Sequence, residues 1–420
     1  MNTKNNSINE NISFKFEIKK NNLNKKQEIF DFFDSLNNDL THKNSKDDEC
    51  TPMKCVEQMI DYIPEEFWNK NNLKILDPCS GNGNFGAYCS FKTDLKNIWF
   101  NELNTIRYEN CKKILNPTHI NNEDFFNMTG DFNNTKFDLI MANPPYSGGG
   151  NKNKSLSNKF IEKSIDLLND QGYLCFITPN NWMSYNNNNT TLKKLLYNGS
   201  FLVIDNNAKK FFPKIGSSFS IFVWQKTKEK IETIVKNKYC IEDTQKVFIE
   251  KDTPFIPLYI SNETLSISKK MVNIKLKNNL IKYRCDLHNF TKSKYLSDKQ
   301  DEKFKFLTIH TARKNRYSTF KQDIYEKNKI IIPLSTYFLP YLVKKSNVTQ
   351  SVAYICIDDN QKQNKLLKKL REAKYKVLIH LTRYGNFNNL KILKNMVLND
   401  IKLNEKEKET INKIANTIKY

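Results

Sequence analysis

The stretch KILDPCSGNGNF, residues 74–85, gives the strongest indication of the fold. It starts with the short apolar run KIL, which is typical of a buried strand, and continues into a loop that contains Gly81 and Gly83. Glycine lets a backbone turn tightly and approach a ligand closely, as a cofactor site between a strand and a helix requires. An ordinary tight turn has the same composition, so the interpretation depends on the neighbouring segments.

Short β-rich runs alternate with helical runs around this stretch, from the helical TPMKCVEQMIDYI (51–63) to about residue 228. This alternation predicts an α/β fold with a doubly wound, mostly parallel sheet whose ligands bind at the carboxyl ends of the strands. The expected strands are KILDP (74–78), NIWFNE (97–102), FDLIMANPP (137–145), YLCFITP (173–179), FLVIDNN (201–207) and SFSIFVWQK (218–226).

Acidic residues follow the second and third units of this pattern. Glu102 ends the second strand at the place where an acidic residue accepts hydrogen bonds from ribose hydroxyls in nucleotide-binding folds. Asp124 and Phe125 follow the third unit and can offer a carboxylate and an aromatic edge to an adenine ring. Each acid taken alone also fits a helix cap or a surface charge. Together with the loop after Asp77, they predict a nucleoside-containing cofactor.

The tetrapeptide Asn143-Pro144-Pro145-Tyr146 follows the apolar strand FDLIMA. The side-chain oxygen of Asn143 and the carbonyl of Pro144 are two acceptors that can bind both hydrogens of an amine, and the two prolines restrict the loop that carries them. Tyr146 can stack on an aromatic base that has left its duplex. A proline-rich turn without chemistry is the alternative.

In combination, Asp-Pro-x-x-Gly-x-Gly-x-Phe (77–85) and Asn-Pro-Pro-Tyr (143–146) resemble the N6-adenine DNA methyltransferases of the TaqI-like, gamma-ordered group, which are of the restriction-modification type. The resemblance covers about residues 45–228. It implies a Rossmann-like methyltransferase sheet, S-adenosylmethionine as the cofactor, and methyl transfer to N6 of an adenine flipped out of DNA at a specific sequence. It implies no metal and no covalent enzyme nucleophile, so Cys79 is interpreted as a structural residue.

Site residues follow from these motifs and from the resemblance. The catalytic loop is Asn143 to Tyr146, and Tyr146 and Phe212 are expected to stack on the base. The loop SGGGNKNKS (147–155) is a candidate lid or a simple connection. The residues expected to bind the cofactor are Thr51, Pro52, Asp77, Pro78, Gly81, Gly83, Phe85, Glu102, Asp124, Phe125 and Asn143.

Three segments are expected along the chain: residues 1–44, partly disordered with a helix over 26–38; a catalytic domain over 45–228; and an α+β target-recognition domain over 229–420. The last contains strand-like and helical runs, among them a helical run over 364–383. It also holds basic and aromatic residues suited to phosphates and base edges, although a solvated surface has the same composition. The expected DNA contacts are Arg313, Arg316 and Arg383, with Lys314, Tyr317 and Tyr384 beside them.

The formal net charge of +22, from 67 Lys and Arg against 45 Asp and Glu, favours a polyanionic partner, here double-stranded DNA, although a nucleotide-biased genome also explains it. RNA adenine N6 or protein glutamine N5 methylation, and an inactive specificity subunit, stay open as alternatives. Neither a membrane-spanning apolar run nor a secretory signal is recognisable, which predicts a cytoplasmic protein of a bacterium or virus. The oligomeric state stays open, and a monomer is compatible with the sequence.

Overall fold

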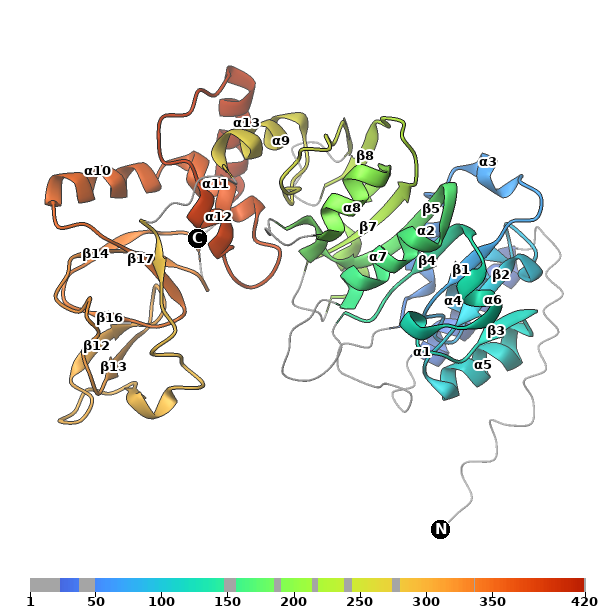
Figure 1. Ribbon diagram of the computed structural model, residues 1–420, viewed down its shortest axis with the longest axis horizontal. Helices are drawn as coiled ribbons and strands as arrows, with labels where there is room; N and C mark the ends of the chain where they lie inside the picture. The colour runs from blue at the N-terminus through green and yellow to red at the C-terminus, as the bar shows by residue number, and fades with distance from the viewer. Residues whose placement is uncertain are drawn as a thin grey trace, which may run out of the picture. The chain divides into compact units, whose positions relative to one another are not determined.

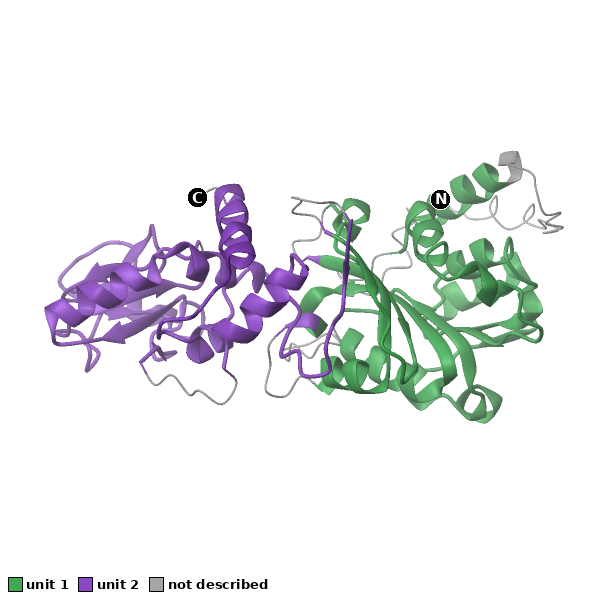
Figure 2. Ribbon diagram, turned by 90° about the horizontal axis from the view of Figure 1, so that it is seen from above, with its two compact units in different colours: residues 1–182, 190–215, 219–236 green, residues 183–189, 216–218, 237–420 purple. Residues whose placement is uncertain are grey.

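The computed structural model describes residues 23–37, 50–146, 156–184, 190–213, 218–237, 244–273, 280–335 and 337–418 of the chain. The chain divides into two compact units (Figure 2). Unit 1 comprises Met1–Trp182, Thr190–Ile215 and Phe219–Lys236, and unit 2 comprises Met183–Asn189, Gly216–Ser218 and Asn237–Tyr420. No helix among the described residues is long and apolar enough to cross a membrane.

Unit 1 is built on a mixed sheet with the strand order β3-β2-β1-β4-β5-β7-β6-β8 (Figure 1). Strand β7 is antiparallel to both of its neighbours, whereas the other neighbouring pairs are parallel. The order reverses between β1 and β4, and ligands of doubly wound sheets bind at such a reversal. The strands are β1 (Ile75–Asp77), β2 (Ile98–Asn101), β3 (His119–Asn121), β4 (Phe137–Ala142), β5 (Leu168–Pro179), β6 (Ser200–Asp205), β7 (Phe219–Gln225) and β8 (Thr233–Lys236).

Helices pack on both faces of this sheet because the buried strands present apolar side chains to both sides. On one face, Met141 and Cys175 share a core with α1, α2, α4 and α5. On the other face, the indole nitrogen of Trp224 donates to the carbonyl of Leu195 in α8 at 3.0 Å. The helices are α1 (Leu23–Asn37), α2 (Met53–Ile60), α3 (Glu65–Trp68), α4 (Asn84–Cys89), α5 (Thr105–Leu115), α6 (Gly130–Asn134), α7 (Leu156–Leu167) and α8 (Thr190–Asn198). The predicted doubly wound α/β sheet is confirmed.

Unit 2 is an α+β unit with two four-stranded sheets, β10-β17-β14-β15 and β11-β13-β12-β16. Its larger core gathers apolar side chains of the first sheet and of the helices around it. The elements are β9 (Thr244–Val247), α9 (Asn262–Met271), β10 (Lys282–Tyr283), β11 (Leu296–Ser297), β12 (Phe306–Ile309), β13 (Asn315–Ser318), β14 (Lys329–Pro333), β15 (Tyr341–Val343), β16 (Asn347–Val348), β17 (Val352–Cys356), α10 (Asn360–Leu370), α11 (Ala373–Leu381), α12 (Leu390–Asn395) and α13 (Glu405–Thr417).

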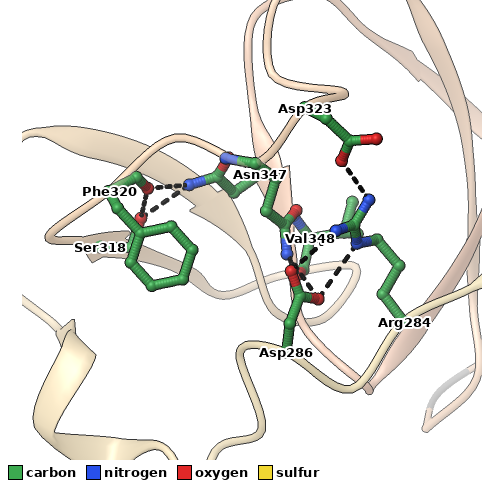
Figure 3. A network of polar contacts seen from close by, with 8 residues as sticks. Arg284, Asp286, Ser318, Phe320, Asp323, Asn347 and Val348 are labelled. Carbon is green, nitrogen blue, oxygen red and sulfur yellow. Dashed lines mark hydrogen bonds and ion pairs between the residues drawn. The ribbon is translucent and has the colours of Figure 1, made fainter.

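A polar network stabilises the loops of the second sheet in unit 2 (Figure 3). The fully buried Asn347 donates from Nδ2 to the hydroxyl of Ser318 at 2.7 Å and to the carbonyl of Phe320 at 2.8 Å. Arg284 forms ion pairs with Asp286 and Asp323 in the same network. Buried polar groups are costly unless they are hydrogen-bonded, so this network lets polar loops pack inside the unit.

Two sequence-based expectations are refined by the described elements. The helical run over residues 364–383 is divided into α10 and α11, because Glu372 between them has an extended backbone conformation. The helix expected over residues 26–38 is α1, which begins at Leu23. The other parts of the N-terminal segment, and the candidate lid over 147–155, lie outside the described residues.

Candidate active site

The motif residues of unit 1 meet at one edge of the sheet. Strands β1, β2, β3 and β4 are parallel, so their carboxyl ends lie at the same edge. Asp77 is the last residue of β1, Glu102 follows β2, and Asn143 follows β4. Asp124 comes shortly after β3. The parallel direction of these strands therefore brings residues separated by up to 66 positions in the sequence to one edge of the sheet.

Glu102 is hydrogen-bonded to the backbone of the glycine loop. Its Oε2 accepts from the Gly81 amide at 2.7 Å, and its Oε1 accepts from the Asn104 amide at 2.8 Å. The side-chain amide of Asn101 donates to the carbonyls of Pro78 at 3.1 Å and of Glu123 at 3.0 Å. The carboxylate of Glu102 is therefore fixed beside the glycine loop, where the sequence predicts contacts with ribose hydroxyls. These bonds fix the loops after β1, β2 and β3 relative to one another.

The two motif glycines are required for different reasons. Gly83 has a φ of +96°, which L side chains rarely adopt, and a Cβ there would lie 2.5 Å from Cδ1 of Leu115, so a substitution would strain the loop that packs on α5. Gly81 has a φ of +55°, but a Cβ there would meet no described atom within 4 Å. The space beside Gly81 is therefore available to a ligand that approaches the backbone.

Asp77 is completely buried at the end of β1. Its Oδ1 accepts a long hydrogen bond from the Cys79 amide at 3.4 Å, and its Oδ2 has no partner among the described residues. Burial raises the pKa of this carboxyl well above its ordinary value, the Cys79 amide opposes that shift, and Glu102 adds to it. A buried oxygen without a partner is costly, and a hydrogen-bond donor of a ligand would satisfy it.

The Asp124–Phe125 pair is held by the loop after β3 and by α7. Asp124 caps this loop, because its Oδ1 accepts from the Phe126 amide at 3.0 Å. Phe125 is 2% exposed and stacks on Phe160 at 4.7 Å between ring centroids. Lys163 donates to the carbonyl of Phe125 at 2.6 Å. The ring of Phe125 therefore has a packing role in the core, and its contact with an adenine ring stays a prediction.

The catalytic loop is attached to the segment that precedes α2. Asn143 donates from Nδ2 to Oγ1 of Thr51 at 3.0 Å, and its Oδ1 accepts from the hydroxyl of Tyr146 at 2.7 Å. The Asn143 carbonyl accepts from the thiol of Cys79 at 3.6 Å. Thr51 is 6% exposed, and its own carbonyl accepts from the side-chain amide of Asn84 in α4 at 2.8 Å. Thr51 thus connects the catalytic loop with the helix that follows the glycine loop, and Pro52 lies at the start of α2.

Three aromatic rings lie beside this loop. Tyr146 contacts Phe219 with ring centroids 5.1 Å apart, and Phe219 stacks on Phe212 at 5.6 Å with 29° between the ring planes. Phe212 is 5% exposed and Tyr146 is partly exposed. Sequence reasoning selected Tyr146 and Phe212 but missed Phe219, which joins them. The apolar start of β7 was the available signal for it.

The remaining predicted site residues differ in their exposure and in their contacts. In the cofactor segment, Phe85 is buried in the core of α4. In unit 2, Arg313 is exposed, whereas the Arg316 side chain is only 15% exposed and pairs with Asp298 through Nε at 2.9 Å. Arg383 is partly buried and donates to the carbonyl of Asn386 at 2.7 Å. Arg316 and Arg383 therefore have structural contacts that the sequence did not predict, and Arg313 is the most accessible of the three.

Comparisons with known proteins identify the family of this chain and proteins that resemble it. Residues 1–212 match the model of the family described as Eco57I restriction-modification methylase. The Type II methyltransferase M.HincII of Haemophilus influenzae is 31% identical over 199 residues, which cover 42% of this chain and 37% of that protein. The release factor glutamine methyltransferase of Mycoplasma mycoides subsp. mycoides SC is 29% identical over 127 residues, which cover 29% of this chain and 44% of that protein.

A solved structure of the Type IIL restriction-modification enzyme MmeI in complex with DNA is similar in fold, with a TM-score of 0.51. It is 12% identical in sequence, and the match covers 92% of this chain and 67% of that one. The chain spans less than half the length of the curated relatives described above. The structural likeness therefore concerns the fold, and it extends beyond unit 1.

The doubly wound sheet, with the glycine loop after β1 and acidic residues after β2 and β3, is an arrangement that suits a nucleoside-containing cofactor such as S-adenosylmethionine. The chain belongs to the Eco57I restriction-modification methylase family. The residues present fit the cofactor, because the site offers the unpartnered Oδ2 of Asp77, open space beside Gly81, and the carboxylate of Glu102.

Proposed function

We propose that this chain transfers the methyl group of S-adenosylmethionine to the N6 amino group of an adenine in DNA, at a specific sequence. The hydrogen-bonding pattern of Asn143 carries the proposal. Its Nδ2 donates to Thr51, so its Oδ1 is the amide atom that can accept a hydrogen from a substrate amine. The carbonyl of Pro144, on the next residue, is the second acceptor expected for the same amine.

Two preorganised acceptors suit the N6 amine because it is a poor nucleophile. Its lone pair is delocalised into the adenine ring, and hydrogen bonds from both N–H groups to Asn143 and Pro144 would favour a tetrahedral nitrogen with a localised lone pair. Pro144 is buried and the two prolines restrict the loop, so little reorganisation is needed. The hydroxyl of Tyr146 donates to Oδ1 of Asn143, and because an amide oxygen has two lone pairs, a second one is left for the amine hydrogen in the proposed complex.

The cofactor supplies the electrophilic methyl group when it is bound. The chain's part is to hold it at the sheet edge: we assign Asp77, Glu102 and Asp124 as hydrogen-bonding residues, with Gly81 beside the open space. The other predicted cofactor residues, Thr51, Pro52, Pro78, Gly83, Phe85, Phe125 and Asn143, would shape the surrounding wall. Asn143 would thus connect the cofactor and the amine.

The aromatic rings beside the loop support a flipped base as the substrate. An adenine inside a duplex cannot reach an enclosed site, and enzymes that modify bases hold the extruded base by stacking. Tyr146 offers a partly exposed ring, and Phe219 and Phe212 continue the aromatic surface behind it. We assign Tyr146 to direct stacking and Phe212 to the wall that supports it.

Three observations support DNA as the partner. The family is one of restriction-modification methylases. The MmeI structure that is similar in fold contains bound DNA. The sequence has a net charge of +22, which favours a polyanion. We therefore propose that the chain after about residue 229 is a target-recognition domain. The glutamine methyltransferase likeness covers 29% of this chain, and it provides no role for unit 2.

The test is methyl transfer from tritium-labelled S-adenosylmethionine to duplex DNA from a methylation-deficient bacterium, single-stranded DNA, RNA and protein extract, followed by nucleoside analysis. We expect N6-methyladenine in DNA. Asn143→Ala should lower turnover by about a hundredfold or more, because its acceptor acts chiefly in the transition state, while cofactor affinity stays near that of the wild type. Methylcytosine in DNA would refute the adenine assignment, and label in RNA or protein alone would refute DNA as the substrate.

A further inference from the structure

Asp205, the last residue of β6, is a buried carboxylate that the proposed mechanism does not use. It is 1% exposed. Its Oδ2 accepts from the hydroxyl of Tyr62 and from Nε2 of Gln58, both at 2.6 Å, and its Oδ1 accepts from the amide of Asn207 at 2.8 Å. These three short hydrogen bonds stabilise the buried carboxylate, because each bond offsets part of the cost of burying the charge.

This cluster lies at the edge of the sheet that carries the catalytic loop. Strand β5 is parallel to β4, and both β5 and β6 are antiparallel to β7, so β6 runs in the same direction as β4. The carboxyl end of β6, where Asp205 lies, is therefore at the same edge as Asn143 at the end of β4. The donors Gln58 and Tyr62 belong to α2 and the turn after it, and α2 begins just after Thr51, which binds Asn143.

The segment between Asp205 and Phe212 is bonded at both of its ends. At its start, the Asn207 amide donates to Asp205. Further along, Lys210 donates from Nζ to Oε1 of Gln58 at 2.8 Å, and the 3-10 turn Ala208–Phe211 connects these two points. Burial and the neighbouring Asp205 carboxylate raise the pKa of Tyr62, so its hydroxyl keeps the proton that it donates. Together with the backbone from Asp205 to Lys210, these bonds close a ring through Gln58, and Phe212 lies two residues after Lys210.

We propose that Asp205 is a positioning residue that, through Gln58 and Tyr62 of the α2 region, holds segment 206–212 and so places the Phe212 wall of the base pocket. The inference rests on the proposed function, because the assignment of Phe212 to that wall is part of the proposed function. Asp205 touches neither the cofactor residues nor the catalytic loop in the described contacts. Its removal should therefore alter the handling of the base without altering cofactor affinity.

Asp205→Asn and Tyr62→Phe test the positioning role of Asp205, the first by a larger change to the hydrogen bonds and the second by a smaller one. An amide has one acceptor and one donor end, so Asn at 205 cannot accept from both the Asn207 amide and the α2 donors. Tyr62→Phe removes one donor and leaves the carboxylate. Tyr88→Phe is the matched control, because the Tyr88 hydroxyl also donates to a carboxylate, that of Asp61, at 2.9 Å, outside segment 206–212.

The first measurement is steady-state methyl transfer to DNA from a methylation-deficient bacterium, together with the Kd for S-adenosylmethionine. We expect kcat to fall about tenfold in Asp205→Asn and less in Tyr62→Phe, with Kd within about twofold of the wild type and Tyr88→Phe unchanged. Combining Asp205→Asn with Phe212→Ala should cause no loss beyond that of Phe212→Ala alone. Wild-type kcat in Asp205→Asn, or losses that multiply in the double variant, would overturn the positioning role.

Amide hydrogen exchange of the full chain gives an answer that does not need the substrate. We expect the amides of residues 206–212 to exchange about tenfold faster in Asp205→Asn, with no change at residues 143–146. Unchanged exchange at 206–212 would overturn the inference even if kcat fell. If the wild-type chain labels no DNA but Asp205→Asn still exchanges faster at residues 206–212, the proposed function is refuted and the role of Asp205 in holding the segment is retained.

Discussion

Thr51 is predicted to bind the cofactor, and its hydroxyl oxygen also accepts a hydrogen bond from Asn143, to which we assign a catalytic role. The bond from Nδ2 of Asn143 determines which end of the amide faces the substrate. Thr51→Val keeps the shape and removes the acceptor, so kcat should fall about tenfold, in line with the loss of one hydrogen bond of about 1 kcal/mol or slightly more. Thr51→Ser should keep most of the activity. A raised KM for S-adenosylmethionine with unchanged kcat in Thr51→Val would instead show a role in cofactor binding alone.

Asp77 gives the site a predictable pH dependence. Because its pKa is raised by burial, the carboxyl carries a proton over part of the range above its ordinary pKa of 3.8. A donor on the bound cofactor would stabilise the carboxylate, so binding must release that proton at low pH. Affinity for S-adenosylmethionine should therefore fall, by up to about tenfold per pH unit, as pH decreases below the raised pKa. Calorimetric titrations of wild type and Asp77→Asn between about pH 5 and pH 8 test this, and a pH-independent affinity in the wild type would contradict it.

The same linkage acts on the stability of the cofactor-free protein with a defined sign. A carboxyl whose pKa is raised in the folded state binds its proton more tightly there than in the unfolded chain. The stability that this protonation contributes is complete below the ordinary pKa and is lost as pH rises through the raised pKa. Without cofactor, Asp77 therefore opposes folding at neutral pH, which is consistent with a residue selected to meet a ligand.

Single residues of the site were predictable to the extent that their chemistry is local. The glycine loop and the Asn143–Tyr146 loop were identified because each follows a strand and has a composition that its chemistry requires. The bond between Thr51 and Asn143, the wall residue Phe219, and Asp205 were not predicted, because each depends on packing between segments far apart in the sequence. Arg316 was assigned to DNA although it pairs with Asp298, because an ion pair across strands leaves no mark in composition.

At the scale of elements, two glycines near the start of α4 have different tasks. A Cβ at Gly86 would lie 2.3 Å from the ring of the buried Phe100, so helix and strand can approach only with glycine there. Gly86→Ala should destabilise the protein by about 1 to 3 kcal/mol through overpacking. Gly81→Ala should cost about 1 to 2 kcal/mol from its positive φ and should additionally weaken cofactor binding.

Urea unfolding and calorimetric titration of both variants separate these tasks. The loss of cofactor affinity relative to the loss of stability distinguishes the two variants. Gly86→Ala should leave S-adenosylmethionine affinity near that of the wild type once the variant is folded. Wild-type affinity in Gly81→Ala would show that the open space beside Gly81 is not part of the cofactor site.

The elements of unit 1 were more predictable than those of unit 2. The six expected strands correspond to β1, β2, β4, β5, β6 and β7, because each is an apolar run buried on both faces. Strand β3 was missed, since it is short and only partly buried, and β8 was missed because it lies beyond the expected end of the domain at residue 228. In unit 2, β13 was overlooked because its residues Asn315–Ser318 are polar, and it is held by pairing with β11 and β12 rather than by its own composition.

At the scale of the whole molecule, the excess of 67 basic over 45 acidic residues does not identify a binding surface, because many basic side chains are already paired. Lys314 and Arg316 share the carboxylate of Asp298, and Arg284 pairs with Asp286. Each such pair reduces the charge that is available to phosphates. Exposed basic residues such as Arg313 are therefore better candidates for DNA contacts than basic residues that form ion pairs within the protein.

This distinction between Arg313 and Arg316 can be measured on the whole chain. Binding to mixed-sequence duplex DNA should weaken with salt, and Arg313→Ala should reduce the slope of log Kd against log salt concentration by about 1, as expected for one lost phosphate contact. Arg313→Lys should retain the slope, because the charge persists. Arg316→Ala should instead lower the free energy of unfolding by about 1 to 2 kcal/mol, because it removes the ion pair with Asp298 and the hydrogen bond to Oδ1 of Asn289. An unchanged slope in Arg313→Ala would show that phosphates are bound elsewhere on the molecule. A changed slope in a fully stable Arg316→Ala would show that Arg316 contacts DNA.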